Sequence, residues 1–304
     1  MKSNLKFAAI DIGSNAVRLL LSEVFEKGHT AIFRKISLIR MPIRLGEDAF
    51  IQHRISDAKI SQLVQSMIGF KHLINAYGPL GYMACATSAM REAENGPEIC
   101  ARINEQANIK VDIIDGSQEA QILFSNSQID LINKEKETLY VDVGGGSTEI
   151  SLLSHGEVMA SKSFNIGTVR LLAGLVSKVH WDQMKDWLKK YSSGSMGFTA
   201  IGSGGNINTT FRLTHCKRGQ PLSYNKIRET RRYIKKFSIQ ERITELALRP
   251  DRADVILPAL EIYLKVLKWC GVRQIYVPEM GLADGIIRDL YKQHKQASIK
   301  KGNR

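Results

Sequence analysis

The stretch LYVDVGGGSTEISLL, residues 139–153, holds the pattern that decides the fold of this chain. An apolar run leads to Asp142, three glycines follow, and Glu149 stands near the start of a second apolar run. Apolar runs separated by a glycine loop predict two strands joined by a tight turn. Three consecutive glycines are costly in chain entropy and place no side chain in a core, so this loop points to a function of its own.

The same order of parts occurs near the N-terminus, in FAAIDIGSNAVRLLLSEVFEKGHTAIFRKISLI, residues 7–39. An apolar strand ends at Asp11, a small polar loop follows, and a second strand leads through a turn at Gly28 into a third strand. In the later segment the corresponding turn falls at Gly156. This shared strand–loop–strand–turn–strand unit, near the start of each half, predicts duplicated α/β domains.

Strands and helices alternate through the rest of each half, which is typical of layered α/β domains. In the first half, apolar periodicity predicts helices over about 60–77 and 96–106. In the second half it predicts a long helix over about 253–270. A last helix, expected at about 286–304, could pack back on the first domain.

The chain turns polar at residues 126–136, where we place the domain boundary. The sequence thus predicts a first domain over residues 1–126 and a second domain over residues 127–304. Basic helices at about 217–247 are expected as an insertion in the second domain.

Composition limits the class of protein. A length of 304 residues fits about two domains, and 43% apolar residues suffice for real cores. No apolar run reaches the roughly 18–20 residues that a membrane span needs. The N-terminal apolar segment is too short for a signal peptide and is interrupted by Asp11. These features predict a cytoplasmic protein without a membrane partner.

The cysteine and histidine patterns argue against a disulfide framework or a zinc site. The four cysteines are widely spaced without a CxxC pair, and the seven histidines show no ligand spacing. A metal is therefore expected on carboxylates, which favours Mg²⁺, with Mn²⁺ as the alternative.

Positive charge is concentrated in one segment of a chain whose net charge is +13. Between Lys217 and Lys236 there are eight basic residues and one acid, Glu229. The segment is either a solvated helix face or a track for a polyanion. No recognised nucleic-acid motif occurs, so we expect no nucleic-acid partner. The candidate track consists of Lys217, Arg218, Arg228, Arg231, Arg232 and Lys235.

Three glycine-containing loops, at residues 13–15, 144–147 and 202–205, are candidates for binding phosphate. Glycine lets backbone N–H groups converge on an anion, although a tight hairpin is the alternative interpretation for any single loop. An aspartate precedes the first glycine of two loops by two residues. A carboxylate beside a phosphate needs a cation between them, so Asp11 and Asp142 predict a bridging Mg²⁺. The candidate phosphate-binding residues of these loops are Gly13, Ser14, Asn15, Gly144, Gly145, Gly146, Ser147 and Gly204.

Two further residues could complete a phosphate site. Arg91 follows a strand end in ATSAMREAENG, and a guanidinium fork matches phosphate oxygens. A surface ion pair with Glu92 or Glu94 is the alternative for Arg91. Glu119 falls in the first turn of a helix predicted by IIDGSQEAQILF, where the helix dipole favours the ionised form that a general base needs. An N-terminal capping acid is the alternative for Glu119.

Several motifs taken together resemble those of a known family. They are, in order, DIGSNAVRLL, ATSAMREAENG, IIDGSQEAQILF, VDVGGGSTEI, SFNIGTVRL, AIGSGGNINT and RADVILPALEI with GLADGII. In this order and spacing they resemble the exopolyphosphatase/guanosine pentaphosphate phosphatase (Ppx/GppA) family, in a short two-domain form. The resemblance implies an α/β fold of two duplicated ribonuclease H-like domains with an interdomain cleft, as in the actin/Hsp70/sugar kinase superfamily.

The resemblance also implies an active site in that cleft, where a terminal phosphate is removed by hydrolysis with Mg²⁺. By motif match, Glu119 is the base that activates the attacking water, Glu149 positions water and metal, and Asp142 lies on the metal. Gly204 corresponds to the superfamily's nucleoside loop and could line a polyphosphate channel. The residues that the resemblance assigns to holding phosphates are Arg91 and the loops at 13–15 and 144–147.

The chain departs from the family pattern at several positions. Gln118 precedes Glu119 where the family often has two adjacent acids, which leaves Glu119 as the single candidate base. Ala16 replaces a frequent serine, and Asn206 stands where threonine is common. The extra C-terminal helical domains of the long members are absent from this sequence, which favours short substrates or lower processivity.

The function favoured by the sequence is that of an exopolyphosphatase, which releases terminal orthophosphate from inorganic polyphosphate with Mg²⁺. The basic segment favours this substrate. A guanosine pentaphosphate 5′-phosphohydrolase is the alternative, and a superfamily kinase or an actin-like scaffold is less favoured. The sequence leaves room for a homodimer that joins two basic tracks.

Overall fold

The computed structural model describes residues 4–28, 30–124, 137–155, 157–192 and 198–302. The chain divides into two compact units, one of Met1–Asn126 with Leu282–Arg304 and one of Ser127–Gly281. Two features expected from the sequence, the polar boundary at 126–136 and the turn at Gly156, lie outside the described residues.

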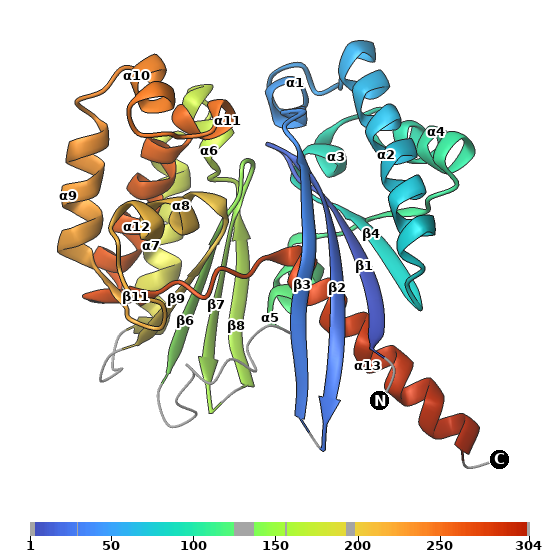
Figure 1. Cartoon of the computed structure of the whole chain (residues 1–304). Helices are drawn as coiled ribbons and strands as arrows, with labels where there is room; N and C mark the ends of the chain where they lie inside the picture. Colours follow the sequence, from blue (N-terminus) through green and yellow to red (C-terminus); the bar gives the residue numbers. More distant parts are fainter. Residues whose placement is uncertain (1–3, 29, 125–136, 156, 193–197, 303–304) are drawn as a thin grey trace. The chain divides into compact units, whose positions relative to one another are not determined.

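The first unit is built on a five-stranded sheet with the strand order β3-β2-β1-β4-β5 (Figure 1). The first three strands form an antiparallel meander, and β4 and β5 run parallel to β1. The strands are β1 (Leu5–Ile12), β2 (Val17–Lys27), β3 (Thr30–Met41), β4 (Gly81–Ala86) and β5 (Val111–Ile113).

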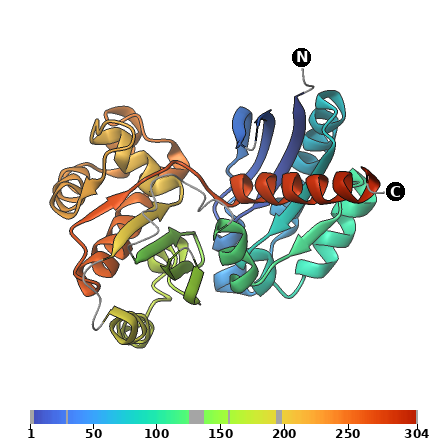
Figure 2. The ribbon, with the colours of Figure 1, turned by 90° about the horizontal axis from the view of Figure 1, so that it is seen from below.

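Every residue of β1 from Phe7 to Ile12 is buried, which shows that both faces of this sheet are covered. Tyr291 and His294 of α13 meet the ring of Phe7 edge-on, with centroids 6.5 and 6.0 Å away, so α13 covers one face. Figure 2 shows α13 running straight across this unit. The helices are α1 (Leu45–Gln52), α2 (Asp57–Tyr77), α3 (Ser88–Glu92), α4 (Gly96–Ala107), α5 (Gly116–Phe124) and α13 (Leu282–Gly302).

The second unit is built on a six-stranded sheet with the order β10-β11-β9-β6-β7-β8. Its antiparallel meander β6-β7-β8 and its parallel strands β9 and β11 repeat the order of the first sheet, with β10 added at the edge. The repeat confirms the predicted duplication of an α/β, ribonuclease H-like domain. The strands are β6 (Thr138–Val143), β7 (Thr148–Ser154), β8 (Glu157–Phe164), β9 (Thr199–Ser203), β10 (Leu222–Ser223) and β11 (Gln274–Tyr276).

The core of the second unit forms around α12. The side chain of Tyr263 in this helix is fully buried among apolar residues of the sheet and of the helices. Within the described residues, neither unit has a helix of the length and apolarity that a membrane span requires. The helices of this unit are α6 (Thr168–Leu172), α7 (Lys178–Ser192), α8 (Gly205–Leu213), α9 (Tyr224–Ile234), α10 (Ile239–Thr244), α11 (Pro250–Ala253) and α12 (Ile256–Trp269).

The long helix expected over about 253–270 is confirmed as α12, although it begins three residues later. A turn at Asp254 and Val255 separates it from the short α11. Pro258 explains the division, because it has no N–H for the carbonyl of residue 254 and its ring would clash with that carbonyl in a continuous helix. Pro258 is tolerated in the first turn of α12, where N–H groups have no intrahelical partner.

Candidate active site

Three parallel strands of the first unit end side by side, and each leads into a residue expected at a phosphate site. Thr87 N–H donates to the carbonyl of Ile12 at 3.1 Å, and Ile114 N–H donates to the carbonyl of Ala86 at 2.9 Å, which holds the three strand ends level. The loop at 13–15 follows β1, α3 follows β4, and α5 follows β5. The structure therefore brings the predicted residues of the first unit to one edge of its sheet: Gly13, Ser14, Asn15, Arg91 and Glu119.

The first glycine loop is a tight turn whose carbonyls face α1. Gly13 N–H donates to the carbonyl of Ala16 at 3.2 Å. The carbonyl of Ser14 accepts from Gly46 N–H at 2.8 Å, and that of Asn15 accepts from Arg44 N–H at 3.2 Å. The start of α1 therefore fixes the orientation of this loop.

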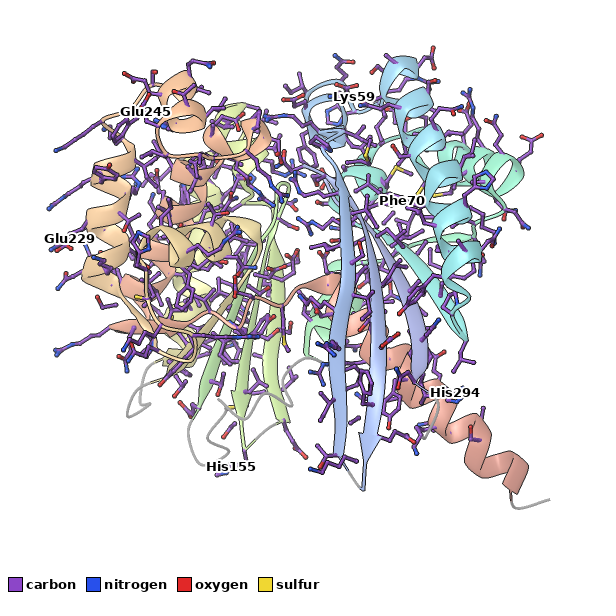
Figure 3. The ribbon with its side chains drawn as sticks, in the orientation of Figure 1. Lys59, Phe70, His155, Glu229, Glu245 and His294 are labelled. Carbon is purple, nitrogen blue, oxygen red and sulfur yellow. The ribbon has the colours of Figure 1, made fainter. Side chains whose placement is uncertain are left out.

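A polar cluster around Lys59 holds the start of α1 in place. Lys59 Nζ donates to the carbonyl of Arg44 at 2.8 Å, to Glu47 at 3.1 Å and to Asp48 at 2.7 Å. Asp48 also accepts from the backbone N–H and hydroxyl of Ser56. In Figure 3, Lys59 is labelled where α2 lies beside α1. The loop at 13–15 is thus positioned by contacts that lie far away in sequence.

The Lys59 cluster makes stability depend on pH. Burial would raise the pKa of Asp48, but hydrogen bonds from Lys59 and Ser56 together outweigh burial, so this pKa lies below its usual value of 3.8. A lowered pKa contributes stability above the unfolded-state pKa, and that contribution is lost as pH falls through the lowered pKa. We expect Lys59→Met to lower Tm at pH 7, and the difference from wild type to shrink below about pH 4. Thermal melts across pH measure this; a difference that stays constant down to pH 3, or one matched by Lys178→Met at an exposed lysine, would contradict it.

Asp11 has a cationic partner within its own unit. It stands directly opposite Arg18 in the β1–β2 ladder, and Arg18 Nη1 lies 2.6 Å from Asp11 Oδ2. The cation that a phosphate loop beside Asp11 requires is therefore supplied by the chain. Metal binding by Asp11 stays a prediction.

Arg91 lies on α3 and connects the ends of two strands. Its Nη1 donates to the carbonyl of Ile114 at 2.7 Å. In the part of the chain that the structure describes, Arg91 forms no ion pair with Glu92 or Glu94. Because this hydrogen bond uses one of the five guanidinium N–H groups, the others are available to a phosphate.

Glu119 lies in the first turn of α5, but other residues cap this helix. Asp115 Oδ1 accepts from the N–H groups of Ser117 and Gln118 at 2.8 Å, and Gln118 Oε1 accepts from Asp115 N–H at 2.9 Å. This reciprocal pair is a capping box built from Asp and Gln. The buried carboxylate of Glu119 is therefore not needed as the cap, and Gln118 has a structural role at the position where the family often has an acid.

The glycine loop of the second unit repeats the turn of the first. Gly144 N–H donates to the carbonyl of Ser147 at 3.0 Å, as Gly13 does to Ala16. The loop lies against α6, which begins at Thr168. Three consecutive loop carbonyls are bound from α6, by Thr168 N–H at 3.1 Å, by Val169 N–H at 2.8 Å and by Arg170 Nε at 2.7 Å.

These contacts orient the N–H groups of the loop. In a trans peptide the carbonyl of one residue and the N–H of the next point in opposite directions. Because the carbonyls of residues 144–146 face α6, the N–H groups of Gly145, Gly146 and Ser147 face away from it. Among the described residues these three N–H groups have no hydrogen-bond acceptor. They form a nest of donors of the kind that binds anions.

Gly167, which the sequence did not single out, fixes the distance between the loop and α6. A Cβ added there would lie 2.3 Å from the carbonyl oxygen of Gly145 and 2.4 Å from the carbonyl carbon of Gly146. The signal was present in the stretch SFNIGTVRL, which also contains Arg170. Both residues act through the loop that they hold.

We expect Gly167→Ala to displace this loop and abolish phosphate release, with a loss of about 1–3 kcal/mol of stability from overpacking. Gly69→Ala is the control, because a Cβ added at Gly69 in α2 meets nothing within 4 Å and is expected to be neutral or slightly stabilising. Urea unfolding and a phosphate-release assay on both variants measure the effects. Full activity in Gly167→Ala would show that the loop position is not critical.

Asp142 and Glu149 form a pair of carboxylates across the β6–β7 ladder. They are directly opposite each other, and a carboxylate oxygen of each lies within 4.8 Å of the other. Like charges in this position repel unless a cation lies between them. The corresponding positions of the first unit hold Asp11 and Arg18, an acid and a base. The donor set of the second unit therefore fits a hard divalent cation such as Mg²⁺.

Neighbouring residues hold both carboxylates in position. Ser163 Oγ donates to Glu149 Oε1 at 2.8 Å, and Ser203 Oγ donates to Asp142 Oδ1. The hydroxyl of Tyr263 donates to the carbonyl of Ser203. Burial, and next the charge of Asp142, raise the pKa of Tyr263 well above its usual range, so Tyr263 stays a protonated donor.

Gly204, expected at a phosphate, lies next to Asp142. Its φ is 111°, and a Cβ there would lie 2.9 Å from the carbonyl oxygen of Val143 and 3.2 Å from Asp142 Oδ1. Glycine is therefore required for both conformation and space. Gly205 is covered by the guanidinium of Arg252, whose Nη1 donates to Asn206 Oδ1 at 3.2 Å, so Asn206 serves to hold an arginine.

The basic track is mostly exposed, with one exception. Arg231 Nη2 lies 3.2 Å from Glu261 Oε2 of α12, so this arginine is tied to its own unit. On α9, Arg228, Arg232 and the adjacent Glu229 are exposed, and Figure 3 shows Glu229 directed away from the unit. The other exposed members of the track are Lys217, Arg218 and Lys235.

The duplicated fold and the two glycine loops define the class of protein. The chain belongs to the Ppx/GppA phosphatase family, whose model matches residues 23–294, and this confirms the family resemblance. Members of this family are phosphatases.

Several known proteins are similar to this chain. The bifunctional 3-dehydroquinate synthase/phosphatase of Fusobacterium nucleatum is 27% identical over 91% of the chain, which spans 45% of the length of that relative. Exopolyphosphatase 1 of Mycobacterium leprae is 21% identical over 93% of the chain and 88% of its own length. A crystal structure of the Aquifex aeolicus Ppx/GppA family member is 25% identical, with a TM-score of 0.76 over 96% of this chain and 99% of that one. An exopolyphosphatase from Cytophaga hutchinsonii, 20% identical, shares the fold with a TM-score of 0.82 over 95% and 98% of the two chains.

Proposed function

We propose that this chain is an exopolyphosphatase that releases terminal orthophosphate from inorganic polyphosphate with Mg²⁺. One observation supports the proposal above the others: Asp142 and Glu149 oppose each other directly beside a loop whose N–H groups face away from α6. A carboxylate pair and an anion nest belong together when a metal ion and a phosphate bind as one unit.

The residues of the second unit would bind and orient. The N–H groups of Gly145, Gly146 and Ser147 would hold the oxygens of the phosphate, and Arg170 would keep the loop in place through the carbonyl of Gly146. Asp142 and Glu149 would hold Mg²⁺, which neutralises phosphate charge and so supplies electrostatic stabilisation of the transition state. The hydrogen bonds from Ser203 and Ser163 would keep both carboxylates oriented.

The residues of the first unit would supply a base and a guanidinium. Glu119 would accept the proton of the attacking water as the P–O bond to the leaving chain breaks. Its place in the first turn of α5 favours the ionised form, because the helix dipole stabilises an anion there. Arg91 would bind phosphate oxygens with the N–H groups that it does not use on Ile114.

Polyphosphate is favoured as substrate by the exposed members of the basic track, because a polyanion gains from closely spaced cations. A relative named exopolyphosphatase covers most of the chain. Guanosine pentaphosphate carries the same kind of terminal phosphate, and it is the alternative that the test must separate.

Phosphate release by the purified chain tests the proposal. We expect release from polyphosphates of defined length, loss of release when EDTA removes divalent cations, and recovery when Mg²⁺ is restored. A faster rate on guanosine pentaphosphate would move the assignment to the alternative substrate. Phosphoryl transfer to an acceptor hydroxyl would indicate a kinase, and filaments without hydrolysis would indicate a scaffold. Release that is insensitive to EDTA would overturn the role of the metal.

A further inference from the structure

We propose that the first unit carries a second ligand site, a cavity of about 760 Å³ between α5, α13 and the β4–β5 edge, which takes a small molecule with an apolar body and a protonated amine. The volume lies in the range of small-molecule pockets, roughly 300–1,000 Å³. Neither Arg91 nor Glu119 is among the described residues that line it. The site is therefore separate from the residues assigned to phosphate.

Apolar side chains line part of the cavity. Met83 and Cys85 of β4 line it, and Ile122 comes from α5. Residues 111–113 of β5 also line it, but Val111 and Ile113 alternate with Asp112 and face the other side of the sheet, where Ile113 lies 3.7 Å from a Cβ added at Gly96 of α4. Beside it α5 and α13 pack closely, since a Cβ added at Gly285 would lie 2.1 Å from the carbonyl oxygen of Ile122. An apolar lining of this kind favours an aliphatic or aromatic body.

Carboxylates set the charge of the ligand. Asp112 of β5 and Asp289 of α13 both line the cavity. Asp112 pairs at 3.3 Å with Lys110, whose side chain is 85% exposed, and Asp289 lies 4.0 Å from Lys292. The Lys110–Asp112 pair is exposed and contributes little, so an amine seated on the apolar side chains can replace it.

The buried thiol of Cys85, which also lines the cavity, has a pKa that is raised by burial and by the same carboxylates. Burial raises the pKa of this thiol to about 12, and nearby negative charges add to the shift. The thiol therefore stays neutral and competes with no cationic ligand. The contributing carboxylates are those of Asp11, Asp112, Glu119 and Asp289.

A ligand in this cavity could regulate activity through α5, the helix that carries Glu119. Gln118 lines the cavity and also accepts from Asp115 N–H at 2.9 Å in the cap of α5. A ligand that draws the side chain of Gln118 into the cavity weakens this cap, one residue before Glu119. This regulatory role rests on the proposed function, whereas binding to the cavity does not.

Calorimetry on the full chain, without polyphosphate, tests the binding with three six-carbon probes: hexylammonium, hexanol and hexanoate. We expect hexylammonium to bind most tightly and hexanoate least. The double variant Asp112→Asn/Asp289→Asn should weaken hexylammonium about fivefold or more, the effect of two partly exposed charge contacts, and leave hexanol unchanged. Asp182→Asn, at an exposed carboxylate of the second unit, is the matched control. Gln121→Trp, which places a large side chain at the exposed rim, should abolish binding of all three probes.

Equal affinity for the three probes, absence of hexylammonium binding, or unchanged binding in the double variant would overturn the amine site. The regulatory role is tested by adding hexylammonium to phosphate-release assays. A change of rate in wild type but not in Asp112→Asn/Asp289→Asn supports it, and an unchanged rate overturns it. A chain that binds hexylammonium but releases no phosphate keeps the cavity site and refutes only the proposed function.

Discussion

Glu119→Gln is expected to lower kcat for phosphate release by about 10²–10⁴-fold, the contribution of a general base, while KM changes little. Glutamine has nearly the same shape but cannot accept the proton of the attacking water. The cap of α5 is made by Asp115 and Gln118, so the helix should remain intact in the variant. Steady-state phosphate release and a thermal melt of the same preparation measure the effect.

The matched control is Glu98→Gln, because Glu98 also lies in the first turn of a helix, α4, but is exposed. We expect wild-type kcat in this control. An activity of Glu119→Gln within twofold of wild type would move the base to another residue. A large fall in Tm would instead show that Glu119 stabilises α5 by a route other than capping.

Asp142→Asn is expected to lower kcat/KM at limiting Mg²⁺ by about 10–100-fold, since one of the two carboxylates assigned to the ion is lost. Without a divalent cation the same change should raise Tm by a degree or two, because it removes a like-charge pair worth about 0.2–1 kcal/mol. With Mg²⁺ the wild-type chain should gain stability by mass action, and the variant should gain less. Melting curves across a Mg²⁺ titration show all of these shifts.

Glu149→Gln should behave like Asp142→Asn, because glutamine can still accept from Ser163 while losing the charge. Asp182→Asn is the control for removal of a carboxylate elsewhere in the second unit. Equal stabilisation of wild type and Asp142→Asn by Mg²⁺ would place the ion on other ligands. A lower Tm for both variants without metal would show that the pair is balanced by another cation.

Local pattern was sufficient for most elements of the fold. The strands around Asp11 and Asp142 end where glycine follows, because apolar periodicity and turn residues act over a few positions. The helix expected over about 253–270 is present as α12 and starts three residues later for an equally local reason, since Pro258 has no N–H for the carbonyl of residue 254.

Only some residues of the candidate site could be predicted from the sequence. Glycine loops and acids at strand ends pointed to phosphate and metal. The capping box of Asp115 and Gln118 could also have been found, because D-x-x-Q before a helix is a recognisable start signal. Ser203 and Tyr263 could not, since they reach Asp142 across 61 residues and more of sequence.

Sequence alone determined where the two repeats lie, which residues their loops contain and which family they resemble, because these depend on order and spacing along the chain. Tertiary structure decided what each loop can do. Pairing of neighbouring strands set Arg18 opposite Asp11 but Glu149 opposite Asp142, so that one loop lies beside an ion pair and the other beside two carboxylates, where we propose that the metal binds. Contacts with α6, more than 20 residues on, turned the carbonyls of residues 144–146 to one side and the N–H groups of residues 145–147 to the other.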